Sequence, residues 1–225
     1  AMMPNISLKT LLVLAALSVL GGCATPTPYD YSAFERNNPA SILVLPPVNR
    51  SPDIKASYSV LSQVSYPLAE AGYYVLPVAV VDETFKQNGL MNADEMHMAP
   101  PAKLREIFGA DAALYIEVTR YGSSYKVLTS EVAVEAHGKL VDLRSGDLLW
   151  EGKALASSAE NQNQSSGGLV GMLITAAVNQ IVNTLSDRGH EIAGITSRRL
   201  LTAGIPNGIL SGPRSPQHPS RLASR

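Results

Sequence analysis

The chain has 225 residues, 45% of them hydrophobic, and its 18 basic and 19 acidic residues leave a formal net charge of −1. This composition excludes a disordered polyelectrolyte, and the charge balance gives no indication of a nucleic-acid partner. A chain of this length can bury the core of one large domain or of two small ones.

The first residues have the pattern of a secretory signal peptide. Lys9 precedes an apolar run over residues 11–20, and Leu20-Gly21-Gly22-Cys23 ends that run. A signal peptide needs a basic start, an apolar segment of about 7 to 15 residues and small residues before the cleavage site. Because a cysteine follows the small residues directly, the pattern predicts a lipobox. We therefore expect residues 1–22 to be removed and Cys23 to receive a diacylglycerol and an N-terminal acyl chain such as palmitate.

This start predicts a lipid-anchored protein, because the apolar run is too short to cross a bilayer. Once Cys23, the only cysteine of the chain, is lipidated, no thiol remains for a disulfide, a zinc–thiolate site or a nucleophile. Ala24 and not Asp follows the cysteine, which by similarity to enterobacterial sorting rules implies the outer membrane. We expect the domain to face the periplasm, and exposure at the cell surface stays an alternative.

The next part of the chain alternates predicted strands and helices. Residues 23–40 contain three prolines and read as a lipidated tether. Residues 41–47 form a continuous aliphatic run closed by two prolines, which is typical of a strand buried on both faces. A helix is expected over residues 56–71, ended by Gly72, with a kink or a break at Pro67.

A second strand is expected over residues 73–81, followed by short helices. Asp82 can cap the first of these helices and Gly89 can end it. Asn92 and Glu95 have the spacing of a capping box. The last short helix is expected over residues 103–108, opened by Pro101 and ended by Gly109.

Three long strands are predicted next, over residues 112–121, 127–141 and 148–157. The last two are joined by a turn over residues 142–147, in which Gly146 can adopt a positive φ and Asp142 can accept hydrogen bonds from turn amides. The alternation of polar and apolar residues over 131–136 indicates an antiparallel sheet with one solvated face. Trp150 is expected to be an anchor in the core or on a face of the sheet, in preference to a platform for a ligand.

A polar loop over residues 157–168 leads into a predicted helix over residues 169–185. The first half of this helix is apolar almost all round, so we expect it to be buried in the domain or against a partner. A second helix is expected over residues 191–203, and residues 206–225, which are rich in proline and lack acidic side chains, predict a disordered tail. The candidate partner or oligomer contacts are Leu169, Met172, Leu173 and Ala176.

Together these elements predict a single α/β sandwich over residues 41–205. It has one mixed sheet of about four to six strands, a long antiparallel hairpin and C-terminal helices.

Six stretches carry a resemblance to a known family: the lipobox, Tyr29–Tyr31, Ser41–Pro47, Tyr66–Val75, Val81–Phe85 and Gly208–Pro216. They resemble a family of Gram-negative outer-membrane lipoproteins of unknown function, which includes a meningococcal genome-derived antigen. The resemblance covers nearly the whole mature chain. It implies a fold similar to the N-terminal domain of TolB. Members are typically encoded beside a relative of the curli secretion lipoprotein, whose hairpins are also similar to residues 142–150, so it implies a partner of that kind.

No catalytic or metal-binding constellation stands out in the sequence. The four histidines, His97, His137, His190 and His218, are scattered, and no two of them have the i, i+4 spacing of a helical metal site. The glycine-containing stretch 165–171 lacks the lysine of a P-loop. We therefore expect no metal and no cofactor.

Three functions stay open. The favoured one is a non-enzymatic outer-membrane lipoprotein, a subunit or assembly factor of an envelope transport or secretion complex with a curli-secretion-like lipoprotein, other lipoproteins or copies of itself. The alternative is a regulator or binder of the cell-wall peptidoglycan machinery, although a tether of about 17 residues reaches roughly 60 Å at most. The third is a periplasmic hydrolase whose nucleophile and base meet only on folding.

Overall fold

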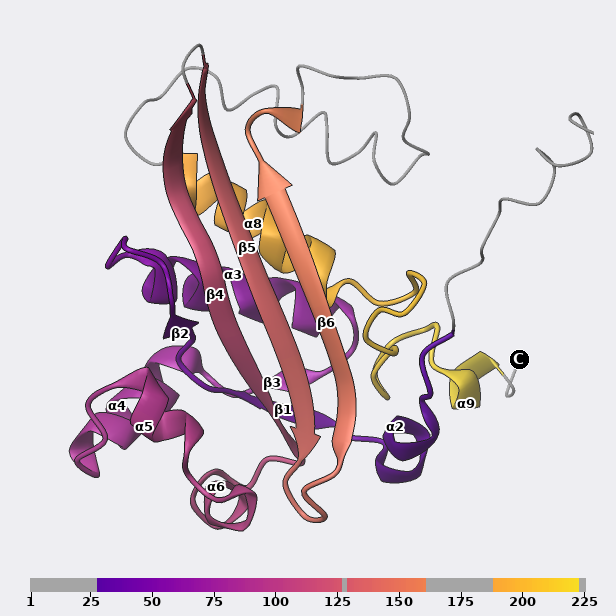
Figure 1. Cartoon of the computed structure of the whole chain (residues 1–225). Coiled ribbons are helices and arrows are strands. Elements are labelled where there is room, and N and C mark those ends of the chain that lie inside the picture. The colour runs from indigo at the N-terminus through magenta and orange to yellow at the C-terminus, as the bar shows by residue number, and fades with distance from the viewer. Residues whose placement is uncertain (1–27, 127–128, 161–187, 223–225) are drawn as a thin grey trace, which may run out of the picture.

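A computed structural model describes residues 28–126, 129–160 and 188–222 (Figure 1). The predicted signal peptide, Cys23 and the predicted helix over residues 169–185 lie outside these ranges. The described chain contains one six-stranded sheet. Its strands are β1 (Ser41–Val44), β2 (Val48–Asn49), β3 (Tyr74–Val75), β4 (Ala112–Lys126), β5 (Thr129–Asp142) and β6 (Leu148–Ser157).

The sheet is mixed, with the order β3-β1-β4-β5-β6 and with β2 also paired to β4. Strand β1 runs parallel to both of its neighbours, and β4, β5 and β6 form an antiparallel meander. The helices are α2 (Ser32–Asn37), α3 (Ala56–Glu70), α4 (Val78–Gln87), α5 (Ala93–His97), α6 (Pro101–Phe108), α8 (Arg188–Leu201) and α9 (Pro219–Leu222). The predicted fold class, an α/β sandwich with one mixed sheet, is confirmed.

Two groups of helices pack on the sheet. Helices α3 and α8 lie side by side and cover one face of it, where the larger apolar core forms around residues such as Leu114 and Ile195 (Figure 1). Helices α4, α5 and α6 close a smaller core around Leu43 and Phe85. The outer face of the meander is polar, since His137, Lys139 and their neighbours point to solvent, as the predicted alternation requires.

Several predicted local signals are confirmed. The Asn92 side chain accepts a hydrogen bond from the amide of Glu95 at 2.9 Å, which caps α5. Gly109 ends α6 in the left-handed conformation. In the turn between β5 and β6, Gly146 has a φ of 78°, and Asp142 Oδ1 accepts hydrogen bonds from the amides of two turn residues.

Two predictions about the first half are wrong. Residues 73–81 are not one strand, because β3 ends at Val75 and α4 starts at Val78 behind Pro77. Proline fixes a φ close to the helical value and needs no amide partner at a helix start, and burial of Val81 and Phe85 then outweighs the β propensity of the valines. Asp82 therefore lies inside α4 and does not cap it.

Helix α3 continues through Pro67, and no break divides it. Pro67 is buried against the core, and this tertiary packing compensates for the hydrogen bond that proline removes.

The predicted limits of the domain are too narrow at both ends. The predicted tether contains α2, whose Phe34 is only 3% exposed. The predicted disordered tail packs on the domain over most of its length, and Ile209 is 1% exposed. The folded unit therefore starts close to Tyr29 and extends past Ser215.

None of the helices in the described part of the chain combines the length and the apolar composition that crossing a bilayer requires.

Candidate functional site

Residues 207–215, which we call the strap, bind the end of α3 through their backbone. The amide of Gly212 donates to the carbonyl oxygen of Ala71 at 2.7 Å, and the amide of Arg214 donates to that of Gly72 at 3.1 Å. Gly72 has a φ of 95°, and a Cβ added to it would lie 2.3 Å from the amide nitrogen of Ser215. Only glycine allows the two backbones to approach so closely.

Two aromatic side chains of the domain donate hydrogen bonds to the backbone of the strap. The Tyr73 hydroxyl donates to the carbonyl oxygen of Leu210 at 2.6 Å, and burial raises the pKa of this phenol above its ordinary value. The Trp150 indole donates from Nε1 to the carbonyl oxygen of Asn207 at 3.0 Å. The ring of Trp150 occupies the space above Gly152, where an added Cβ would meet it at 2.3 Å. The only tryptophan of the chain therefore joins the sheet to the strap.

The strap in turn fixes the point at which the chain enters the domain. The amide of Tyr29 donates to Asn207 Oδ1 at 2.9 Å, and the hydroxyl of Tyr31 donates to the carbonyl oxygen of Gly208. The rings of Tyr29 and Tyr31 are 5.0 Å apart, and Tyr31 contacts the buried Phe34 edge-on. The chain is thus held from Tyr29 onward, only six residues after Cys23.

A groove of about 680 Å³ lies between α2 and residues 204–219, and we call it the anchor-side groove. Phe34 and Ile209 form its floor, Leu210 and Pro219 contribute apolar wall, and Glu35 stands exposed at its rim. In volume and in its mainly apolar lining it matches sites that hold small apolar ligands.

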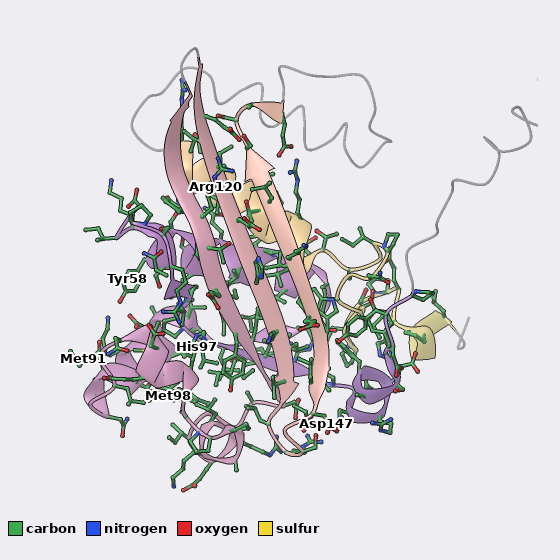
Figure 2. All side chains as sticks on the ribbon, viewed as in Figure 1. Tyr58, Met91, His97, Met98, Arg120 and Asp147 are labelled. Carbon is green, nitrogen blue, oxygen red and sulfur yellow. The ribbon has the colours of Figure 1, made fainter. Side chains whose placement is uncertain are left out.

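A second hollow, of about 330 Å³, opens between α4, α5 and α6. Its wall includes Met98 and Ile107, which are 75% and 51% exposed. Figure 2 shows Met98 and the exposed Met91 at the outer edge of these helices, away from α2. The two apolar surfaces of the domain therefore lie on different sides of it (Figures 1 and 2).

One serine–histidine contact between α3 and α8 resembles a catalytic pair. Ser59 Oγ lies 3.0 Å from His190 Nδ1, and the other ring nitrogen of His190 lies 2.7 Å from the side-chain amide of Gln63. The serine oxygen also accepts a hydrogen bond from the Tyr121 hydroxyl at 2.9 Å, and Ser59 is only 8% exposed. This arrangement fastens two helices together and offers no accessible nucleophile.

The other histidines lie apart from one another, as the sequence indicates. His97 Nε2 donates to the carbonyl oxygen of Pro46 at 2.9 Å, its ring meets Tyr115 edge-on, and burial lowers its pKa (Figure 2). His137 lies 3.4 Å from Glu135 on the open face of the sheet. Within the described ranges, no group of three His, Cys, Asp or Glu side chains is arranged to hold a metal ion.

One carboxylate ties the first strand to the hairpin turn. Asp111 accepts hydrogen bonds from the hydroxyl of Ser41 and from the amides of Ala40 and Ser41, and Arg144 lies 2.6 Å from its other oxygen. Burial alone would raise the pKa of the Asp111 carboxyl, but these hydrogen bonds and the Arg144 guanidinium hold it below its ordinary value.

The site residues predicted from the sequence are not those that form the strap and the anchor-side groove. Cys23, Leu169, Met172, Leu173 and Ala176 lie outside the described residues, so their roles stay predictions. Sequence reasoning missed the strap, the groove beside it and the Ser59–His190 contact. The one available signal for the strap was the stretch Gly208–Pro216, which is among those that resemble the family.

Comparison with known proteins agrees with that resemblance. The chain is 50% identical, over 206 residues, to "Putative lipoprotein NMB1124/NMB1162" of Neisseria meningitidis serogroup B, covering 91% of this chain and 95% of that protein. The crystal structure of lipoprotein GNA1162 from Neisseria meningitidis is 54% identical and covers 65% of this chain and all of that one, with a TM-score of 0.53.

A PelC dodecamer from Paraburkholderia phytofirmans is similar at 15% identity, covering 71% of this chain and 93% of that one, with a TM-score of 0.39. The family described as "Putative lipoprotein GNA1162-like" matches residues 29–214, which begin at the first residue held by the strap and include all of the strap except Ser215. The chain belongs to this GNA1162-like lipoprotein family.

Proposed function

We propose that the chain is a non-enzymatic lipoprotein of the outer membrane, lipidated at Cys23, that works at the membrane surface as a periplasm-facing subunit or assembly factor of an envelope transport or secretion complex. The partner it would meet there is a curli-secretion-like lipoprotein. Membership of a lipoprotein family and the lipobox support the anchor.

The observation that carries the proposal is the short distance between the anchor and the folded domain. Because Tyr29 is fixed by Asn207 and the strap, only six Cα–Cα steps separate Cys23 from the first fixed residue. At about 3.5 Å per step it reaches roughly 21 Å when fully extended. The 17-residue tether expected from the sequence would have reached about three times as far. The domain is thus confined to the surface of the membrane that anchors it.

This confinement separates the proposal from a regulator that reaches the cell wall. Such a regulator needs a long or extensible tether, and α2 together with the aromatic residues before it removes most of the length that the sequence offered. A hydrolase is also disfavoured, because Ser59 is buried and its oxygen already accepts a hydrogen bond from the Tyr121 hydroxyl.

Within the complex, we expect partner or self-contact at Leu169, Met172, Leu173 and Ala176, the apolar stretch predicted from the sequence. Affinity purification of the tagged, lipidated protein from native outer membranes in mild detergent, with mass spectrometry and sizing, tests this. The wild-type chain should be recovered in a large complex with other lipoproteins. Leu173→Asp should abolish recovery of the complex, whereas Thr175→Asp, which adds the same charge on the polar side of the predicted helix, should leave it unchanged.

The tether itself can be tested in the same assay. A flexible linker of about 20 residues inserted before Tyr29 adds roughly 25 Å of average reach without touching the fold. We expect the complex to be lost or weakened, because the domain no longer stays at the membrane surface. Recovery of the linker variant in the same complex, or of wild type only as a monomer, would contradict the proposal.

A further inference from the structure

The anchor-side groove lies at the point where the lipidated end of the chain enters the domain. Figure 1 shows α2, α9 and the strap together on the β6 side of the sheet, where the described chain begins. Tyr31 and Phe34 belong both to this entry segment and to the lining of the groove. The groove is therefore an apolar surface close to the point at which the anchor joins the domain.

We propose that the anchor-side groove holds one acyl chain of the protein's own lipidated Cys23. The inference rests on the lipidation included in the proposed function and adds a place for one of the chains. The groove is floored by Phe34 and Ile209, walled by Leu210, Ile205 and Pro219, and polar mainly at its rim. A long saturated chain needs this kind of apolar channel and no hydrogen-bonding partner along its length.

The covalent connection makes this occupant the favoured one. Since roughly 21 Å of extended chain separates Cys23 from Tyr29, the lipid stays within reach of the groove at all times. Such a tether converts binding into an intramolecular step with an effective concentration on the order of millimolar. A free membrane phospholipid has no such advantage at this site.

One acyl chain can leave the bilayer without releasing the protein. A triacylated cysteine has three chains, and two are enough for stable anchoring at about 0.8 kcal/mol per buried CH₂. The third chain exchanges one apolar environment for another. Its binding would fix the orientation of the domain, with α2 and the strap against the membrane surface.

Photo-crosslinking of the full-length lipoprotein in its native membrane tests this inference. Cells are grown with a diazirine-containing fatty acid, which enters the acyl chains of the lipoprotein, and are irradiated before the protein is purified and digested. We expect branched peptides that join the Cys23 peptide to the segments 31–38 or 204–219. These peptides identify the protein's own lipid, because an adduct of a membrane phospholipid carries a phosphate headgroup and no Cys23 peptide.

Two adjacent substitutions on α2 provide a matched pair. Glu35 is exposed and lines the groove, so Glu35→Trp should fill it and lower the yield of the branched peptide several-fold. Arg36 is also exposed and does not line the groove, so Arg36→Trp should leave the yield unchanged. Both substitutions are at the surface, and circular dichroism verifies that both variants fold.

Three results would overturn the inference: phospholipid adducts in the groove, crosslinks confined to bulk lipid, or equal yields in the two variants. If Cys23 carries lipid but gives no groove adduct, only the groove occupant is wrong. If Cys23 carries no lipid at all, the proposed function itself fails.

Discussion

Replacement of Gly72 by alanine tests the role of the strap most sharply. At this position a side chain faces two separate obstacles. The φ of 95° lies in the region that L-residues rarely adopt, and the new Cβ would lie 2.3 Å from the backbone nitrogen of Ser215. Because the nearest atom belongs to backbone, a change of side-chain rotamer cannot relieve the overlap.

The magnitude follows from a comparison with Gly89. Gly89 has a similar φ of 83° and nothing within 4 Å of an added Cβ, so Gly89→Ala measures the backbone strain alone, about 1 kcal/mol. Gly72→Ala adds the steric overlap, which in a packed site costs about 1–3 kcal/mol. We therefore expect a loss of about 2–4 kcal/mol in the free energy of unfolding, unless the strap detaches and relieves part of it.

Urea unfolding of the mature chain and hydrogen exchange of peptides from residues 207–215 measure both effects. Gly72→Ala should lower stability by more than Gly89→Ala and should also remove amide protection from the strap, starting with Gly212 and Arg214, whose amides bind the end of α3. If the two variants lose equal stability and keep equal strap protection, the close contact at Gly72 is not what holds the strap.

Three further outcomes follow from single contacts. Trp150→Phe removes the donor to the Asn207 carbonyl and should cost about 1–3 kcal/mol of unfolding free energy in urea titrations followed by circular dichroism. The pKa of Asp111 is lowered in the folded state, so its contribution to stability is present above its ordinary value of 3.8 and is lost as the pH falls through the lower folded value. Asp111→Asn should therefore show a smaller loss of stability on acidification below about pH 4 than wild type, and an equal loss would contradict this. Ser59→Ala removes the oxygen that meets His190 and should cost about 1–3 kcal/mol in thermal unfolding, while recovery of the envelope complex stays at the wild-type level.

Local signals in the sequence predict much of this fold. The N-cap at Asn92, the glycine at Gly109 and the turn around Gly146 each depend on residues close in the chain, and all three are confirmed. The long strands β4, β5 and β6 are also predicted, because their apolar pattern is long and regular, but β4 continues to Lys126, five residues beyond its predicted end.

The errors arise where distant contacts decide the structure. The valines after Pro77 have a high β propensity, but they form α4 because Val81 and Phe85 complete the smaller core. The C-terminal prolines and arginines resemble a disordered tail, yet residues 207–215 are ordered by Gly72, Tyr73 and Trp150 from two other parts of the chain. No local pattern contains this information.

The reach of the anchor also depends on a contact between residues that are distant in the sequence. The length of the tether depends on where the chain first becomes fixed, and that point is set by the hydrogen bond between Tyr29 and Asn207, which are separated by most of the sequence. Counting residues up to the first strand overestimates the reach of the anchor.

The most direct test of the account is the height of the domain above the membrane. Neutron reflectometry of the lipidated, full-length protein in a supported bilayer measures the thickness of the solvent layer between the headgroups and the protein. A tether fixed at Tyr29 predicts a protein layer that adjoins the headgroups, with a gap no larger than about 21 Å. A gap closer to the roughly 60 Å of a fully extended 17-residue tether would contradict the membrane-surface role.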